Sequence, residues 1–324
     1  MPASRTPQEP EVGDVSVADV LAAQARLRRF LPPTPLHYAE RFGVWLKLEN
    51  LQRTGSYKVR GALNALLAGR ERGDDRPVIC ASAGNHAQGV AWAAYRLNIP
   101  AITVMPHGAP ATKIAGVAHW GATVRQHGES YDEAYAFARA LADQHGYRFL
   151  SAFDDPDVIA GQGTIGMELF EQAPDLDAVF VAVGGGGMIA GIGAALRTLA
   201  PGVDIIGCWP ENDPALEQSL KAGKIVEVPA SATLSDGTAG GVEPGAITLP
   251  LCKALLTDTV LVSEAQIRAA MRDIASSERW IIEGAAAVAV AAMKKCAHRY
   301  QGKRVAVVLC GRNIALDTFL EAVK

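Results

Sequence analysis

The chain lacks the features that mark several large classes of protein. Its five cysteines, at positions 80, 208, 252, 296 and 310, lie far apart and never in CxxC spacing, which argues against disulfides or a zinc site. Its apolar runs are broken by glycine and polar residues, and none reaches the roughly 18 positions of a membrane helix. A net charge of -3 without a basic cluster argues against binding to nucleic acid. We therefore expect a cytoplasmic protein with reduced thiols that binds neither membranes nor nucleic acids.

The 324 residues are enough for one large α/β unit or two closely joined lobes. The opening segment, Met1 to Glu11, is polar and contains prolines but no apolar core. It is expected to be a frayed leader rather than a signal peptide or an anchor.

Short apolar runs alternate with amphipathic segments of helical length along the chain. The predicted strands are Val78 to Ala81, Ala101 to Met105, Ala122 to Arg125, Ala178 to Val183, Val203 to Cys208, Thr259 to Val262 and Arg304 to Leu309. The predicted helices are Asn85 to Leu97, Ala111 to His119, Tyr131 to Gln144, Pro156 to Glu171, Gly187 to Leu199, Glu264 to Ser276 and Glu283 to Cys296. Such alternation is typical of mainly parallel sheets covered by helices on both faces.

The segment from Pro77 to Phe149 forms a βαβαβα pattern that could close its own small sheet. We therefore predict an α/β fold of two lobes, each a mainly parallel open sheet flanked by helices, with a cleft between them. Residues 1–76 and 150–324 would form the large lobe, and residues 77–149 a small mobile lobe. Ligands of open α/β sheets bind at the carboxyl ends of strands, so the strand-to-helix loops are expected to carry the chemistry.

Lys58 lies in the segment Gly55-Ser56-Tyr57-Lys58-Val59-Arg60-Gly61-Ala62, between a predicted strand and a helical pattern. The pattern places it in the first turn of the helix, where unpaired N–H groups disfavour an ammonium and should lower its pKa. A lysine of this kind can lose its proton and attack a carbonyl as a free amine. A solvated surface lysine is the alternative.

A second loop opens the next predicted helix. Its small residues Ser82, Ala83 and Gly84 let backbone N–H groups approach an anion such as a carboxylate, whose charge the helix start favours. Asn85 adds a donor and an acceptor, and His86 follows it. The alternative is an ordinary helix start with Ser82 or Asn85 as the N-cap.

The third loop contains four glycines and a methionine: Gly184, Gly185, Gly186, Gly187 and Met188. Four glycines cost considerable backbone entropy, so close approach to a phosphate explains them better than a tight turn. The loop also fits a dinucleotide-binding pattern with Glu211 as ribose acceptor. This leaves an NAD-dependent dehydrogenase as a remote alternative.

Cys310 ends a buried strand that continues as Gly311, Arg312 and Asn313. A plain core thiol is one interpretation of Cys310. Taken together, however, an amine, an anion-binding loop, a phosphate-sized glycine turn and a small polar group suggest one ligand. Pyridoxal 5′-phosphate has the matching aldehyde, phosphate and heteroaromatic ring.

From about Val15 onward, the chain resembles the fold type II pyridoxal-phosphate enzymes of the serine/threonine dehydratase and serine racemase group, which have the tryptophan synthase β-like fold. The segments Lys47 to Ala62 and Ser82 to Gly89 carry the resemblance. It implies that Lys58 holds the cofactor as a Schiff base with Tyr57 against it.

The resemblance assigns further roles around the cofactor. Asn85 would bond its phenolic oxygen, residues 184–188 would cradle its phosphate, Gly237 would pass its edge, and Cys310 would face its pyridine nitrogen. Glu283 matches an active-site glutamate of the group, with a helix-start carboxylate as the alternative. A homodimer is expected from the resemblance alone.

Departures from the group's pattern favour elimination. Racemases use a serine as second base where this chain has Ala83, and an arginine where it has Tyr131. Trp209 and Ala215 stand where metal-dependent relatives carry acidic residues, so we predict no metal site, although nearby acidic residues leave the alignment open.

We therefore predict a catabolic PLP-dependent dehydratase (ammonia-lyase) whose substrate carboxylate is held by residues 82–86 and whose Cα proton is removed by Lys58. The substrate would be threonine, serine or a bulkier β-hydroxy amino acid such as phenylserine or 3-hydroxyaspartate, and the products a 2-oxo acid and ammonia. A racemase or a β-replacement synthase on the same fold is the alternative. Arg312 could point to solvent or shape the pocket.

Overall fold

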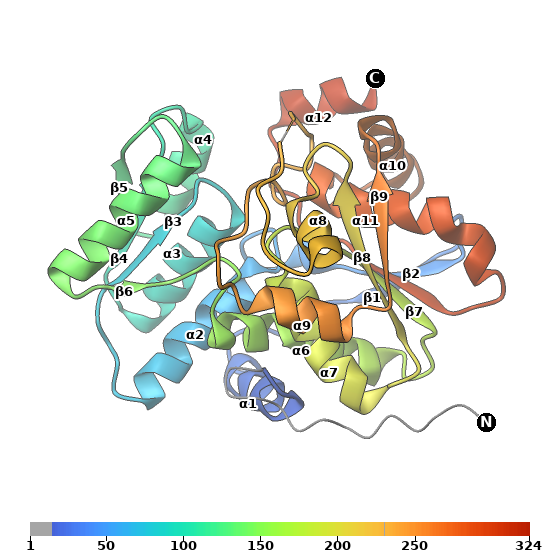
Figure 1. Ribbon diagram of the computed structural model, residues 1–324, viewed down its shortest axis with the longest axis horizontal. Coiled ribbons are helices and arrows are strands. Elements are labelled where there is room, and N and C mark those ends of the chain that lie inside the picture. The colour runs from blue at the N-terminus through green and yellow to red at the C-terminus, as the bar shows by residue number, and fades with distance from the viewer. Residues whose placement is uncertain (1–14, 230) are drawn as a thin grey trace.

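Two open sheets, each with its own helices, form the two sides of the molecule (Figure 1). The computed structural model describes residues 15–229 and 231–324. The predicted N-terminal leader lies outside the described residues. None of the helices within these ranges is long and apolar enough to span a membrane.

The larger sheet has six strands in the order β1-β2-β10-β7-β8-β9. Their bounds are β1 Leu36–Ala39, β2 Val44–Lys47, β10 Val305–Val308, β7 Ala178–Ala182, β8 Asp204–Pro210 and β9 Asp258–Val262. Only β1 runs antiparallel to its neighbour, β2. The other neighbours are parallel, with Val307 opposite Leu46 and Ala306 opposite Val179. The apolar residues of β7 and β10 are buried along their whole length, as expected for inner strands covered on both faces.

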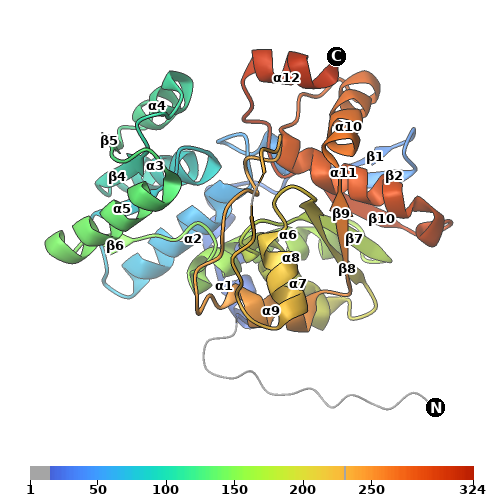
Figure 2. The same ribbon diagram turned by 45° about the horizontal axis from the view of Figure 1, so that its top comes forward.

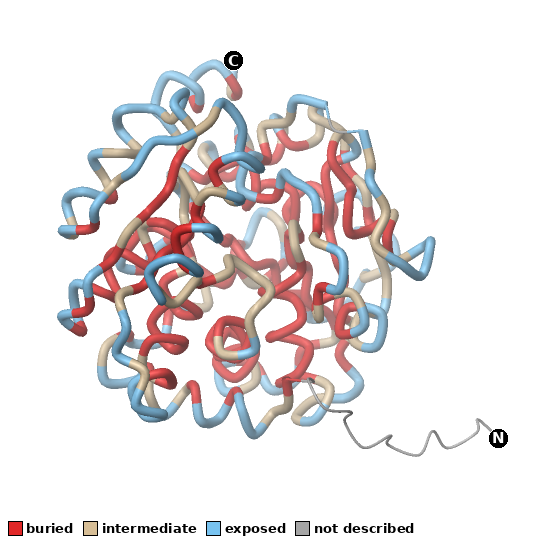
Figure 3. The backbone as a smooth tube through the Cα atoms, turned by 60° about the vertical axis from the view of Figure 1, so that its left-hand side comes forward, coloured by how far each residue is buried: buried red, intermediate tan, exposed pale blue. Residues whose placement is uncertain are grey.

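Helices cover both faces of this sheet (Figures 1 and 2). One face carries α1 Val17–Leu27, α6 Pro156–Gln172, α7 Gly187–Leu199 and α9 Thr248–Leu255, and the other α10 Glu264–Ser277, α11 Gly284–Cys296 and α12 Leu316–Val323. The short α8, Ala215–Ala222, contacts α9. Helix α11 is rich in alanine and valine and lies between the sheet and α10, so nearly all of its residues are buried. Figure 3 shows buried backbone through the interior and exposed backbone at the periphery.

The smaller sheet has four parallel strands in the order β5-β4-β3-β6. These strands are β3 Val78–Ala81, β4 Ala101–Met105, β5 Thr123–Gln126 and β6 Arg148–Phe149. They come from the segment in which the sequence predicts a second sheet. Helices α3 Asn85–Leu97 and α4 Ala111–Ala118 pack together on one side, and α5 Tyr131–His145 packs on β3 and β4.

Helix α2, Lys58–Glu71, joins the two sides because it packs against both α3 and α6. Glycines permit both close approaches. A Cβ on Gly89 of α3 would lie 3.0 Å from the backbone carbon of Lys58, and a Cβ on Gly161 of α6 would lie 2.7 Å from the Cα of Gly61. The helix that begins with Lys58 is thus held tightly between its neighbours.

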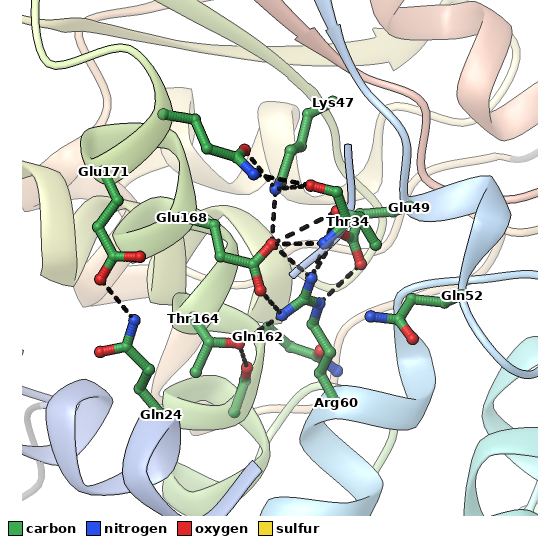
Figure 4. A network of polar contacts seen from close by, with 12 residues as sticks. Gln24, Thr34, Lys47, Glu49, Gln52, Arg60, Gln162, Thr164, Glu168 and Glu171 are labelled. Carbon is green, nitrogen blue, oxygen red and sulfur yellow. Dashed lines mark hydrogen bonds and ion pairs between the residues drawn. The ribbon is translucent and has the colours of Figure 1, made fainter. Parts of the chain in front are cut away.

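A buried charge cluster lies beside the start of α2 (Figure 4). It consists of Lys47 from β2, Glu49 from the following turn, Arg60 from α2 and Glu168 from α6. The guanidinium of Arg60 bonds both carboxylates, at 2.7 Å to Glu49 and 2.6 Å to Glu168, while Lys47 Nζ lies 2.5 Å from Glu168 Oε2. Two cations and two anions therefore balance one another and tie the segment before Lys58 to α6.

The predicted strands and helices agree with the observed ones to within two residues at nearly every end. The predicted helix at 283–296 begins one residue later, since Glu283 is its N-cap. The sequence pattern did not predict β1, β6, α1, α8, α9 or α12. Strand β6 has only two residues, and α8, α9 and α12 have only eight each, which leaves little periodicity to recognise.

Candidate functional site

The carboxyl ends of three parallel strands bring the predicted loops together. Because β2, β10 and β7 are neighbours in the large sheet, the Lys58 loop, Cys310 and the glycine loop all leave the sheet at one edge. The first two are also bonded to each other. Tyr57 N donates to Cys310 O at 3.1 Å, and Arg312 N donates to Gly55 O at 2.9 Å.

Two adjoining cavities lie at this edge. The inner one, of about 30 Å³, is lined by Tyr57, Lys58, Asn85, Phe153, residues 182–189, Gly237, Thr238, Glu283, Ala285 and Cys310. The outer one, of about 290 Å³, shares Lys58, Asn85 and the first two glycines of the loop, and extends past residues 81–86 to Lys113, Tyr131, Asp236 and Asn313. All the predicted cofactor residues line the inner cavity, and all the predicted substrate residues line the outer one.

Lys58 is the first residue of α2, as the sequence predicts. Its amine donates to Ala152 O at 2.7 Å and lies 5.3 Å from the centre of the Tyr57 ring. Burial lowers the pKa of Lys58 to about 8, against the opposing attraction of Cys310 and Glu283. Burial is thus the main cause of the lowered pKa, rather than the position at the helix start that the sequence suggested. The result is a lysine that readily gives up its proton near neutral pH.

Glu283 is buried between two asparagines at the boundary of the two cavities. Its Oε1 accepts from Asn85 Nδ2 at 2.8 Å, and its Oε2 accepts from Asn313 N at 3.0 Å. Burial, and next the negative charge of Asp236, raise the pKa of Glu283 to about 7 although both hydrogen bonds act in the opposite direction. Glu283 can therefore hold or release a proton near neutral pH.

The glycine loop has no room for side chains. A Cβ on Gly185 would collide with the ring of Phe153, and one on Gly187 would lie 2.8 Å from Phe153 O. Gly186 has a φ of +92°, a conformation that favours glycine. The loop lines the inner cavity and runs into the N-terminus of α7, where the unpaired N–H groups of a helix start would stabilise a phosphate.

Cys310 and Tyr57 present uncharged groups to the inner cavity. Burial raises the pKa of the Cys310 thiol well above its ordinary value, and it does the same for the Tyr57 phenol. Gly237 lies against α11, where a Cβ would be 3.2 Å from that of Ala285. A neutral thiol can meet a pyridine nitrogen without forcing a proton onto it.

The predicted substrate loop forms the wall of the outer cavity. The N-cap of α3 is Gly84 rather than Ser82 or Asn85, and Ser82 Oγ accepts from Gly84 N at 3.1 Å. The buried ring of His86 is bonded to Leu150 O at 3.0 Å, and burial lowers the pKa of His86 to about 3. His86 is therefore neutral, and it can offer the cavity its backbone N–H at the helix start.

Several cavity residues carry little signal in the sequence. Phe153 and Thr238 approach the glycine loop, and the sequence assigned neither of them a role, although Thr238 directly follows Gly237. The position of Phe153 soon after the end of β6 could have indicated it, since that is a strand-end loop. Arg312 is exposed and lines neither cavity. The side chain therefore points to solvent, one of the two possibilities left open by the sequence.

The positions at which metal-dependent relatives carry acidic residues are not arranged around a metal site in the part of the chain that the structure describes. Trp209 and Ala215 are buried, and Glu217 pairs with Lys221 at 2.6 Å. Within residues 15–229 and 231–324, no group of three or more His, Cys, Asp or Glu side chains is arranged to hold a metal ion.

The chain belongs to the family of pyridoxal-phosphate dependent enzymes, whose pattern it matches over residues 27–311. It is 41% identical over 309 residues to the L-threonine ammonia-lyase of Thermotoga maritima, covering 94% of this chain and 77% of that protein. It is 37% identical over 315 residues to the L-threo-3-hydroxyaspartate ammonia-lyase of Pseudomonas sp., covering 95% and 98%. A solved structure of a pyridoxal 5′-phosphate-dependent aspartate racemase superposes with a TM-score of 0.89 at 32% identity, covering 95% and 98%.

The residues at the cavities fit the cofactor of this family. Lys58 supplies an amine with a lowered pKa, and the glycine loop supplies backbone free of side chains at the cavity wall and the start of α7. Asn85 supplies an amide and Cys310 a neutral thiol to the wall of the inner cavity.

Proposed function

We propose that this protein is an ammonia-lyase that removes water from a β-hydroxy amino acid and gives a 2-oxo acid and ammonia. One observation carries the proposal: the amine of Lys58, with its lowered pKa, lines the outer cavity together with Ala83, which has no hydroxyl. The two ammonia-lyases at 41% and 37% identity support the same activity.

The proposed cofactor contacts follow the walls of the inner cavity. Lys58 would be the covalent attachment point, with the Tyr57 ring against it, and Gly184 to Met188 would bind the phosphate. Asn85, Gly237 and Cys310 would contact the ring. When bound, the cofactor supplies the electron sink that makes the substrate's Cα–H acidic.

The chain's own groups would then carry the elimination. The backbone N–H groups from Ser82 to His86, at the start of α3, would hold the substrate carboxylate. The freed amine of Lys58 would take the proton from Cα. Glu283, whose pKa is about 7, would hold or release a proton beside Asn85. Closure of the cavity would exclude water during these steps.

A racemase is the second candidate because the aspartate racemase structure matches this fold so well. Racemisation requires a base on each face of Cα. The outer cavity offers Lys58 on one wall, whereas Ala83 cannot act as a base and His86 is engaged with Leu150 O. A cavity with a base on one wall fits elimination from one substrate enantiomer better than it fits racemisation.

The test is a screen for 2-oxo acid release across threonine, serine, phenylserine and 3-hydroxyaspartate in all configurations. We expect release from one Cα configuration only, and Lys58→Ala serves as the background. Conversion of one enantiomer of serine or aspartate into the other, without 2-oxo acid, would replace this proposal with the racemase. Borohydride treatment of the holoenzyme should attach a pyridoxyl group to Lys58, which mass spectrometry of peptides detects.

We also propose a lobe motion, an oligomeric state and a cellular location for this activity. The small lobe, residues 77–149, would move against residues 1–76 and 150–324, and it would do so within a homodimer. Small-angle scattering with and without substrate tests the motion, and light scattering tests the dimer. A role in amino-acid catabolism in the cytoplasm suits the five free cysteines, and cell fractionation tests the location.

A further inference from the structure

Asn313 lies where three loops of the site meet. Its side-chain Nδ2 donates to Thr54 O at 2.7 Å, in the loop that leads to Lys58, and to Asn85 Oδ1 at 2.6 Å. Its backbone N–H donates to Glu283 Oε2 at 3.0 Å. One residue thus bonds the lysine loop, the asparagine loop and the buried glutamate.

These contacts fix which way both amides face. Thr54 O can only accept, so the Asn313 NH₂ group must face it rather than the amide oxygen. The second hydrogen of the same NH₂ group meets Asn85, which must therefore turn its oxygen toward Asn313. A flip of either amide would bring two oxygens or two NH₂ groups together.

The consequence is that Asn85 turns its own NH₂ group toward the cavities. One of its hydrogens goes to Glu283 Oε1 at 2.8 Å, and the other is left for an acceptor on a ligand. Asn85 lines both cavities, so this donor lies at the position expected to meet the cofactor ring. Fixing a donor before the ligand arrives lowers the cost of binding.

Two glycines keep room for this arrangement. Gly55 has a φ of +73°, and a Cβ there would lie 2.6 Å from Asn313 Oδ1. A Cβ on Gly311 would collide with the carboxylate of Glu283. The contacts of Asn313 are therefore built into the backbone of both loops rather than made by a loosely placed surface side chain.

We propose that Asn313 is a positioning residue that sets the orientation of the Asn85 amide and so presents a donor to the cofactor. It acts on the cofactor through Asn85, while its bond to Thr54 O fixes which way its own amide faces. The inference rests on the cofactor assignment, which borohydride labelling of Lys58 tests independently.

The experiment is a double-mutant cycle on cofactor binding. Apoproteins of the parent, Asn313→Ala, Asn85→Ala and the double variant are titrated with pyridoxal 5′-phosphate, and the pH dependence of the bound cofactor's visible absorbance is recorded. Asn313→Ala should weaken binding roughly 5- to 50-fold, the effect of losing one or two oriented hydrogen bonds, and should shift the midpoint of the pH dependence. In the Asn85→Ala background it should weaken binding less than about twofold.

Equal losses in both backgrounds, or a parental affinity and pH midpoint in Asn313→Ala, would overturn the proposal. Arg312→Ala is the matched control because it alters the exposed neighbour in the same loop, and it should bind like the parent. If Asn313→Ala does not fold, Asn313→Asp keeps the shape and removes the donors to Thr54 O and Asn85. It should show the same loss of affinity, and parental binding in this variant would equally count against the proposal.

Discussion

Two polar clusters lie beside the start of α2, and they differ in how their charges are satisfied. The charge cluster of Lys47, Glu49, Arg60 and Glu168 balances two cations with two anions at hydrogen-bonding distance. The cavity cluster of Lys58, Asn85, Glu283 and Asn313 contains an amine and a carboxylate that do not pair with each other. Lys58 and Arg60 are two residues apart in the same helix. Their position along the chain therefore does not explain why Arg60 is paired with carboxylates and Lys58 is not.

The direction of the pKa shifts separates the two clusters. The neighbouring carboxylates raise the pKa of Arg60 despite burial, and Arg60 and Lys47 lower the pKa of Glu168, so these two charges are stabilised. Burial lowers the pKa of Lys58 and raises that of Glu283, so both charged forms are destabilised. Lys47 is the exception, because burial lowers its pKa although Glu168 opposes the shift. A satisfied cluster stabilises the fold, whereas an unsatisfied one keeps protons available for transfer.

The largest expected effect is on activity, from a change in the cavity cluster. Lys58→Ala should lower kcat/KM by more than about 10³-fold, since it removes the cofactor attachment and the Cα base together. The free energy of unfolding of the apoprotein should fall by no more than about 1 kcal/mol, because within the described residues the amine bonds only Ala152 O and burial disfavours its charged form. Activity assays check the expected loss of kcat/KM, and urea unfolding checks the free energy of unfolding. Apoprotein destabilisation as large as that expected for Arg60 would erase the contrast.

The charge cluster should respond in the opposite way. Arg60→Met leaves Glu49 and Glu168 buried with only Lys47 as a cation, which should cost about 3–5 kcal/mol in the free energy of unfolding. Urea unfolding of the apoprotein measures it. Arg72→Met is the matched control at the end of the same helix: Arg72 is 58% exposed and pairs with Asp157 at the surface, so its loss should cost at most about 1 kcal/mol. Similar losses for both variants would show that burial is not what distinguishes Arg60.

The raised pKa of Glu283 predicts a smaller, pH-dependent effect. In the unfolded chain this carboxyl group ionises near its ordinary pKa of 4.5, and in the folded apoprotein near 7. The folded state therefore holds a proton that the unfolded state loses, so the contribution of Glu283 is fully present below about pH 4.5 and is lost as pH rises through about 7. Its size is on the order of 3 kcal/mol.

Glu283→Gln removes this contribution. The free energy of unfolding of the variant apoprotein should decline less steeply than that of the parent between about pH 5 and 8. Glu321→Gln alters a carboxylate that is 71% exposed, and its curve should run parallel to the parent curve. If the Glu283→Gln curve is also parallel, the carboxyl group ionises at an ordinary pKa.

Much of the site could be predicted because its residues follow strands and open helices. Lys58, Asn85 and the glycine loop each carry such a local signal, and parallel strands bring their ends to one edge. The bond between Asn85 and Asn313 joins residues 228 positions apart, and no periodicity reports such a pair. The buried pairing of Arg60 could not be predicted from the sequence either. A lone arginine in a helix resembles a solvated charge until its two glutamate partners are placed beside it.

The smallest expected effect concerns an exposed ion pair that joins the two sides across the outer cavity. Lys113 of α4 and Asp236 of the loop between α8 and α9 lie 3.0 Å apart with 31% and 61% of their side chains exposed, so the pair should stabilise the fold by less than about 1 kcal/mol. Both residues line the outer cavity, so we expect the pair to affect substrate binding through the proposed closure of that cavity. Lys113→Met should raise KM a few-fold and make KM less sensitive to added salt, because screening weakens the pair in the parent.

Lys303→Met removes a comparable exposed pair with Asp177, at 3.1 Å and outside both cavities, and should leave KM and its salt dependence unchanged. A KM that stays parental in Lys113→Met, with the same response to salt, would mean that the pair contributes nothing to closure.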